Sequence, residues 1–153
     1  MKPEHRQFFA DLSEAQILGL CIWAEARGEG EEGRIAVGSV VLNRAEYGKA
    51  HDPWGRRFGN CIHGVVLAPA QFSWTMAMDP QYEKCVKIAR DFEGSYHDHA
   101  SLFTMHGIAL GLLQGNIERN VKALYYHTLA VRPKWARNMK AERIIGNHIF
   151  YEG

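Results

Sequence analysis

The position of one acid, Glu25, suggests that it could act as a proton donor in catalysis. Three apolar residues lie three, four and seven positions before it and so share its helical face: Ile22, Cys21 and Leu18. At the end of such a stripe a carboxyl group loses water, which raises its pKa. A glutamic acid that keeps its proton near neutral pH can protonate a departing oxygen. From the helix alone we favour a structural Glu25, either exposed at the helix end or ion-paired with Arg27 or Arg44.

The neighbouring acids Glu29, Glu31 and Glu32 offer no obvious second catalytic group. Gly28 and Gly30 flank Glu29 and interrupt the helical pattern, so these acids are not expected to share a helical face with Glu25. We predict that they are solvated acids at the start of the next helix, where the helix dipole favours negative charge. Ordinary glycoside hydrolysis uses two carboxyl groups at a defined separation, and the spacing identifies only one.

Helical patterns dominate the first three quarters of the chain. Ser13 and Gln16 form a capping box, which predicts a helix from residue 14 to about Gly28. The apolar run 35–42 predicts a second, central helix. Residues 46–60 contain glycines and charges and are predicted to form a loop. Short helices are expected over 61–67, 80–91 and 100–113, with 70–78 irregular.

Two aromatic, β-branched segments, 123–128 and 143–151, are predicted to pair as a small antiparallel hairpin. The expected fold class is therefore α+β and mainly α, with a small antiparallel sheet near the C-terminus. The length of 153 residues fits one domain spanning 1–153.

Bulk composition excludes some function classes. A formal net charge of +1 gives no general case for a nucleic-acid partner. A late basic cluster could form a local patch, but we favour a solvated face; its residues are Arg132, Lys134, Arg137, Lys140 and Arg143. No apolar stretch is long enough to cross a membrane. The polar start has no signal core, so we expect synthesis in the cytoplasm without export by a signal peptide. The three cysteines form no metal-binding or redox pair, and Cys21 and Cys85 are expected to be buried thiols.

Five blocks of residues, in order over about 18–151, resemble the SleB-type cell-wall hydrolases, which include spore cortex-lytic enzymes. They are Trp23–Glu29 followed by Glu32–Arg44, Gly64–Val66 with Pro69–Trp74, Ala123–His127, Pro133–Ala136, and Ile145–Tyr151. The resemblance implies a lysozyme-like fold related to lytic transglycosylases, with Glu25 as the catalytic residue. It also implies peptidoglycan glycan strands as the substrate, with cleavage between N-acetylmuramic acid and N-acetylglucosamine. No cofactor or metal is implied, and we expect a monomer.

Substrate contacts are expected from the matching blocks around the cleft. Trp74 and Trp135 could each contact a sugar or pack in the core. One of Tyr125 and Tyr126 should enter the core, and we favour Tyr126 for the cleft. The predicted substrate-binding residues are Gln71, Phe72, Ser73, Tyr126, His127 and Trp135.

Alternatives to a lytic transglycosylase remain at this point. A muramidase would use water in place of the muramoyl 6-hydroxyl. A zinc-dependent peptidoglycan amidase or peptidase is suggested by the eight histidines, including His97 and His99, but no HExxH motif is present. A non-catalytic wall-binding protein is the third alternative. A compact enzyme without a signal peptide resembles a bacteriophage endolysin, acting on the host wall after release; a catalytic domain of a larger protein is the other reading.

Overall fold

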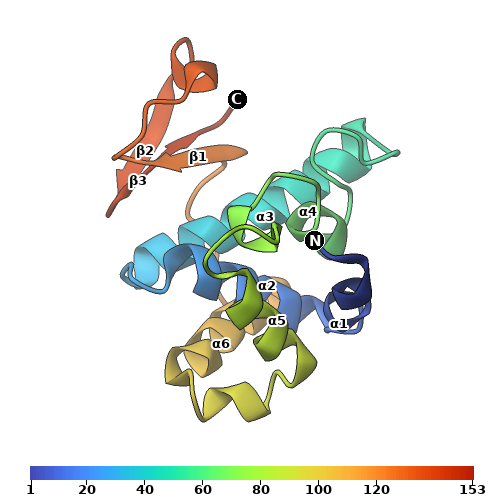
Figure 1. The fold of residues 1–153 in the computed structure, drawn as a ribbon. Coiled ribbons are helices and arrows are strands. Elements are labelled where there is room, and N and C mark those ends of the chain that lie inside the picture. Colours follow the sequence, from blue (N-terminus) through green and yellow to red (C-terminus); the bar gives the residue numbers. More distant parts are fainter.

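Helices form most of the chain, and a small sheet follows them near the C-terminus, as predicted (Figure 1). The computed structural model describes residues 1–153 throughout. The helices are α1 (Arg6–Ala10), α2 (Glu14–Ala26), α3 (Glu31–His51), α4 (Ile62–Val66), α5 (Tyr82–Arg90) and α6 (Ala100–Gln114). The strands are β1 (Tyr125–Thr128), β2 (Ala141–Ile145) and β3 (His148–Tyr151). Short 3-10 turns lie at Pro3–His5, Ser73–Thr75, Gly94–Tyr96 and Lys134–Ala136.

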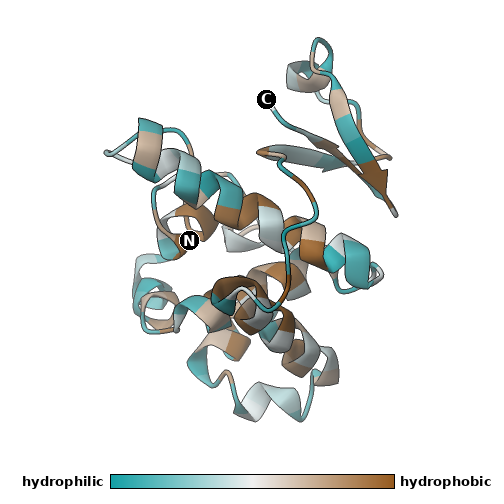
Figure 2. Cartoon of the chain, turned by 180° about the vertical axis from the view of Figure 1, so that it is seen from behind, coloured by the Kyte–Doolittle hydropathy of each residue, from teal (hydrophilic) through white to brown (hydrophobic).

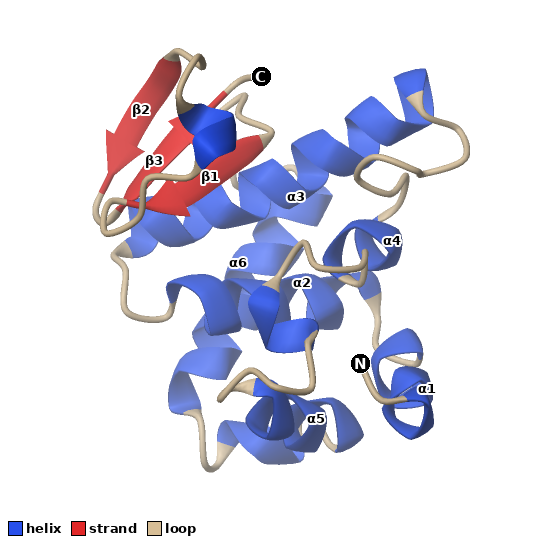
Figure 3. Ribbon diagram, turned by 45° about the horizontal axis from the view of Figure 1, so that its top comes forward, coloured by secondary structure: helices blue, strands red, loops and turns tan.

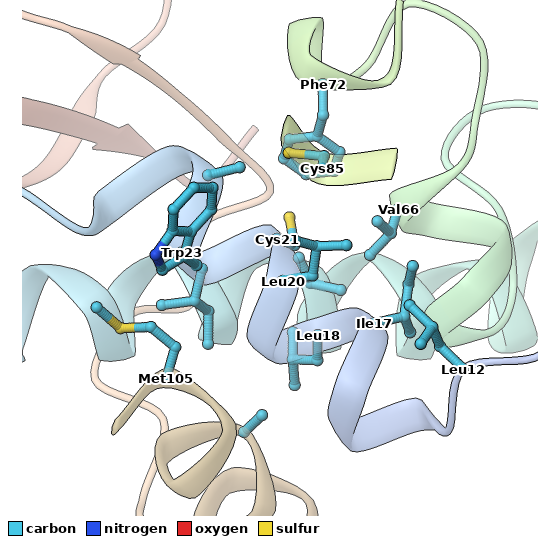
Figure 4. Packing of buried hydrophobic residues seen from close by; sticks show 14 of the residues in the cluster. Leu12, Ile17, Leu18, Leu20, Cys21, Trp23, Val66, Phe72, Cys85 and Met105 are labelled. Atoms are coloured by element: carbon cyan, nitrogen blue, oxygen red, sulfur yellow. The ribbon is translucent and has the colours of Figure 1, made fainter. Parts of the chain in front are cut away.

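Helix α2 is the centre of the main core. Its predicted capping box is present: the Ser13 hydroxyl accepts from the Gln16 backbone N–H at 3.1 Å, and the Gln16 side chain accepts from the Ser13 N–H at 2.9 Å. Side chains from α1, α3, α4, α5, α6 and the 72–74 segment belong to this core. Figure 4 shows part of this packing, with Leu12, Val66, Phe72, Cys85 and Met105 around the helix. Gly19 allows α6 to approach closely, because a Cβ there would lie 3.0 Å from the His106 Cα.

Helix α3 separates two hydrophobic cores, which explains why its middle is apolar almost all round (Figure 2). Val41 and Leu42 pack in the main core with α2. Ala36 and Val40 pack in a smaller core against the sheet. The sheet and the remaining helices therefore lie on different sides of α3 (Figures 1 and 3).

The prediction of a loop from residue 46 was wrong, since α3 continues to His51. Gly48, which we read as part of a loop, is buried inside the helix. A Cβ at this position would overlap the Gly59 carbonyl, so this glycine permits close packing and does not end the helix.

The segment 143–151 is two strands, not the single strand expected. Gly146 and Asn147 form a turn between β2 and β3, and Gly146 has a left-handed φ of 54°. Strand β3 lies between β1 and β2, and all pairings are antiparallel. In the β1–β3 pair Tyr126 stands opposite Phe150, which places Tyr126 over the smaller core.

The remaining expectations were largely met. Segments 61–67, 80–91 and 100–113 contain α4, α5 and α6, and Gly115 ends α6 with a φ of 79°. The short helix α1 was not predicted. Cys21 and Cys85 are buried free thiols, whereas Cys61 is exposed. None of the helices is both long enough and apolar enough to span a membrane.

Candidate active site

A pocket of about 360 Å³ lies where the end of α2 faces β1. Glu25 comes from α2, Arg44 from α3, and Tyr126 and His127 from β1. The 70–76 segment supplies the opposite rim. The pocket therefore gathers six of the seven predicted site residues, all except Trp135. Its lining is Glu25, Arg44, Ala70, Gln71, Phe72, Ser73, Met76, Tyr126, His127, Thr128, Val131 and His148.

Glu25 is a partly buried acid with one protein hydrogen bond. The Tyr126 hydroxyl donates to its Oε1 at 2.9 Å, while no protein donor contacts Oε2. Burial raises the pKa of Glu25; the nearby Asp79 adds to this, and the Tyr126 hydrogen bond and the Arg44 charge oppose it. The sequence-based prediction of a desolvated acid with a raised pKa is thus confirmed.

Neither arginine considered as an ion-pair partner binds Glu25. Arg27 lies over the Trp23 ring, 4.1 Å from its centroid, and donates to the Gln81 side chain. Arg44 donates through Nε to the Leu124 carbonyl at 2.7 Å. The carboxyl group of Glu25 is therefore not neutralised by a direct ion pair.

Arg44 is an unusual wall residue, and the sequence analysis considered it only as an ion-pair partner. Its side chain is buried between the rings of Phe58 and Phe72. No hydrogen bond satisfies its Nη1, and burial lowers its pKa. This cation therefore acts on Glu25 through space and favours the ionised carboxylate that would exist after proton transfer.

Tyr126 faces the cleft, as predicted, but it also packs against both cores. Burial, followed by the charge of Glu25, holds the pKa of Tyr126 well above its ordinary value. The hydroxyl of Tyr126 therefore keeps its proton. When the Glu25 carboxyl group is ionised, this hydroxyl is the donor of their hydrogen bond, because a carboxylate can only accept. Tyr125 does not enter the core; it accepts a hydrogen bond from Arg57 and lies beside Trp135.

The opposite rim is the segment Ala70–Ser73. Ala70 has a left-handed φ of 59°, a conformation that is uncommon for residues other than glycine. Gln71 and Ser73 are exposed and line the pocket, and the side-chain amide of Gln71 makes no hydrogen bond to protein. It therefore does not orient Glu25 but is available to a ligand. Phe72 is only 1% exposed and packs in the core, so it can offer almost no surface to substrate.

A second hollow of about 580 Å³ continues the pocket past β1. The two share Arg44, Gln71, Tyr126 and His127 among their walls, and we call them together the groove. Trp135, which is 46% exposed, lines the second hollow, so its indole is open to a ligand there. Trp74 is fully buried, which settles the alternative for this residue in favour of the core.

The histidines of the site are occupied by protein partners. His127 contacts the Tyr151 hydroxyl through Nε2 at 2.9 Å and the Thr128 carbonyl through Nδ1 at 2.7 Å. His148 is buried beside Glu29, and burial lowers its pKa. No group of three or more His, Cys, Asp or Glu side chains comes together as a set of metal ligands, and His99 packs against the Trp23 ring.

Glu29 is not the solvated helix-capping acid that we expected. Its side chain is 9% exposed. Oε1 accepts from the Asn147 backbone N–H at 3.0 Å and lies 3.0 Å from His148 Nδ1. Glu29 thus ties the α2–α3 connection to the β2–β3 turn, behind the pocket wall. No residue spacing could reveal this, because the two segments are 118 positions apart.

A separate cavity of about 620 Å³ lies on another face, between α3 and the 119–124 segment. None of the predicted site residues lines it. Its walls carry charges of both signs, and Arg119 there pairs with Glu46. The larger volume does not make this the better candidate site, since Glu25 and the residues that face it line the other pocket.

Solved structures with the same fold include two SleB catalytic domains. The catalytic domain of the germination-specific lytic transglycosylase SleB from Bacillus anthracis matches with a TM-score of 0.64 at 23% identity, covering 92% of this chain and 97% of that one. The catalytic domain of the Bacillus cereus SleB protein matches with a TM-score of 0.64 at 23% identity, covering 90% and 88%. No curated protein sequence matches the chain.

The sequence model of one protein family, described as Cell Wall Hydrolase, matches residues 28–151. The match begins just after Glu25 and includes every other predicted site residue. It covers most of the chain, in agreement with the resemblance found in the sequence blocks. The chain therefore belongs to the cell wall hydrolase family.

Proposed function

We propose that this enzyme cleaves peptidoglycan glycan strands between N-acetylmuramic acid and N-acetylglucosamine as a lytic transglycosylase, with Glu25 as its acid and base. The observation that carries the proposal is the position of Glu25. Its carboxyl group lies in the wall of a groove, is desolvated, and has a raised pKa. A protonated carboxyl group of this kind is what the departure of a sugar oxygen requires.

The proposed reaction begins with transfer of the Glu25 proton to the glycosidic oxygen as its bond to the muramoyl C1 breaks. The Glu25 carboxylate then removes the proton of the muramoyl 6-hydroxyl, and that oxygen bonds to C1. The product is a 1,6-anhydro sugar, Glu25 regains its proton, and no water is consumed. Because nucleophile and electrophile belong to one sugar, the second step gains from proximity.

The acids of the groove favour this route over hydrolysis. Glu25 is the only Asp or Glu in the walls of the groove. A two-carboxyl hydrolase needs a second acid facing the scissile bond. Glu29 is engaged with the β2–β3 turn, and Asp79, although it raises the pKa of Glu25, does not line the groove. Arg44 and Tyr126 would stabilise the Glu25 carboxylate between the two steps.

Mass spectrometry of digested peptidoglycan tests the proposal. We expect muropeptides ending in 1,6-anhydro-N-acetylmuramic acid. Reducing N-acetylmuramic ends would instead mean that water attacks, as in a muramidase. Free stem peptides would support the amidase alternative.

Glu25→Gln tests the role of the acid itself. The substitution keeps the shape and an acceptor for Tyr126 but removes the transferable proton. We expect it to abolish lysis while the protein still folds and binds glycan. Undiminished lysis would reject the assigned role and would agree with a site elsewhere.

A further inference from the structure

The connection between β1 and β2 is strongly cationic. Between Thr128 and Ala141 it contains no acid and four basic residues: Arg132, Lys134, Arg137 and Lys140. All four are exposed, and none takes part in an ion pair. The charge is thus concentrated in a chain whose formal net charge is only +1.

This connection lies at one end of the groove. Arg132 and Arg137 line a hollow of about 440 Å³ together with His127 and Tyr151. His127 also lines the pocket of Glu25, and Pro133 also lines the hollow of Trp135. The three hollows therefore adjoin one another through His127, and the two arginines line the one that contains neither Glu25 nor Arg44. In Figure 1 the connection lies beyond the sheet, at the end of the molecule opposite α5 and α6.

We propose that Arg132 and Arg137 form a binding site for the carboxylates of the peptide stems of peptidoglycan. The inference rests on the proposed function, since it assumes a glycan strand in the groove. It adds that the enzyme prefers strands whose stems carry free acids over strands with amidated stems.

The chemistry of the substrate fits this site. Each stem is joined to a muramoyl sugar and carries carboxylates, while the sugars themselves are uncharged. An extended peptide spans roughly 3.3–3.6 Å per residue, so a stem of a few residues can leave the sugars and reach the end of the groove. A guanidinium group binds a carboxylate through two parallel hydrogen bonds, which makes arginine well suited to this contact.

The position of the charges favours a stem over a separate phosphate polymer of the wall. A site for a separate phosphate polymer could lie anywhere on the protein surface, whereas a site for a stem must lie beside the groove that holds the glycan strand. Arg132 and Arg137 share a hollow with His127, a residue of the catalytic pocket. Whatever binds them is therefore close to the strand being cut.

The test uses insoluble peptidoglycan freed of phosphate polymers, before and after its carboxylates are converted to amides by a carbodiimide and ammonia. Binding is measured by sedimentation with the Glu25→Gln protein, so that no substrate is consumed. The double variant Arg132→Gln/Arg137→Gln is compared in this background. The matched control, Lys84→Gln/Lys87→Gln, removes two exposed charges of α5 that line none of the three hollows.

We expect the double arginine variant to bind free-acid peptidoglycan about threefold to tenfold more weakly, as for two exposed charge pairs. This difference should shrink at high salt. The amidated polymer should bind the arginine variant and its parent equally, and the control should behave like the parent on both polymers.

Two results would overturn the proposal. Equal binding of the arginine variant and its parent to the free-acid polymer would remove the site. An equal loss on both polymers would show that the arginines contact sugars and not carboxylates. Neither result depends on catalysis, so the proposed reaction stands or falls separately, on the products of the active enzyme.

Discussion

The Tyr126 hydroxyl on β1 donates a 2.9 Å hydrogen bond to Oε1 of Glu25 at the end of α2. This contact joins the sheet to the main helical core across 101 positions of sequence. It also fixes the direction of the acid, because one carboxyl oxygen is held and the other has no protein partner. Burial and the hydrogen bond act on the pKa of Glu25 in opposite directions, and burial prevails.

Replacing Tyr126 with Phe should weaken catalysis and move its pH dependence. The hydrogen bond favours the ionised carboxylate, so its removal raises the pKa of Glu25 further. The fall in activity at the alkaline side, where Glu25 loses its proton, should therefore move to higher pH. Loss of a hydrogen bond to a charged group should reduce kcat roughly 10- to 100-fold. Initial rates of lysis measured across pH check both effects.

Tyr47→Phe is the control for this variant. The Tyr47 hydroxyl accepts from Arg57 and lies outside the pocket of Glu25. It should leave the alkaline limb in place. An alkaline limb that also stays in place in Tyr126→Phe would mean that a group other than Glu25 controls it.

Glu25→Gln should stabilise the fold at neutral pH while abolishing lysis. In the folded state the pKa of Glu25 is raised, mainly by burial. Below the unfolded pKa both states are protonated, and Glu and Gln should be nearly equivalent. As the pH rises above that value, the unfolded state ionises first and the wild type loses stability relative to Gln. The gain in Tm from the substitution should thus grow from about pH 4 upwards and become constant above the folded pKa.

Thermal unfolding followed by circular dichroism at several pH values measures this difference. The comparison is Glu31→Gln, which replaces an exposed acid at the start of α3. A Tm difference for Glu25→Gln that does not vary with pH would contradict the assignment of a desolvated carboxyl group.

Local signals in the sequence predicted the helices well. The capping box of Ser13 and the nearly all-apolar run in α3 depend on residues a few positions apart, and both were interpreted correctly. The end of α3 was missed because glycine is a helix breaker only on average. Position 48 lies inside the helix and is a glycine because the nearby Gly59 carbonyl leaves no room for a side chain. Such packing is invisible in the sequence.

The site was predicted only in part, because some of its residues are recognised by local patterns and others by contacts with distant segments. Glu25 and Tyr126 were identified, the first by its helical face and the family motif and the second by the motif and strand alternation. Glu29 was misread because its partners lie in the β2–β3 turn. A signal for that turn existed: Gly146–Asn147 between two β-branched segments is typical of a two-residue hairpin turn, and it was read as part of one strand.

Trp135→Ala should weaken substrate binding more than it slows the chemical step. The indole is half exposed in the second hollow of the groove, beside Tyr125 and His127. Loss of one aromatic contact should raise KM about threefold to tenfold with little change in kcat. Trp54→Ala removes an indole that is 80% exposed and outside the groove, and KM should then stay constant. Equal effects of the two substitutions on KM would remove Trp135 from the binding surface.

Glu29→Ala should destabilise the protein although Glu29 takes no part in the proposed reaction. The substitution leaves the buried His148 without its acidic partner and the Asn147 N–H without an acceptor. Removing one partner from a buried polar cluster costs about 2–4 kcal/mol. For a chain of this size that cost lowers Tm by roughly 5–15 °C.

The control is Glu31→Ala, at the exposed start of α3. It should cost less than about 1 kcal/mol, the contribution of a helix-dipole contact. Although His148 lines the pocket, the folded fraction of the Glu29→Ala protein should keep its alkaline limb, because that limb depends on Glu25. A Tm equal to that of Glu31→Ala would show that Glu29 is solvated, as the sequence alone suggested.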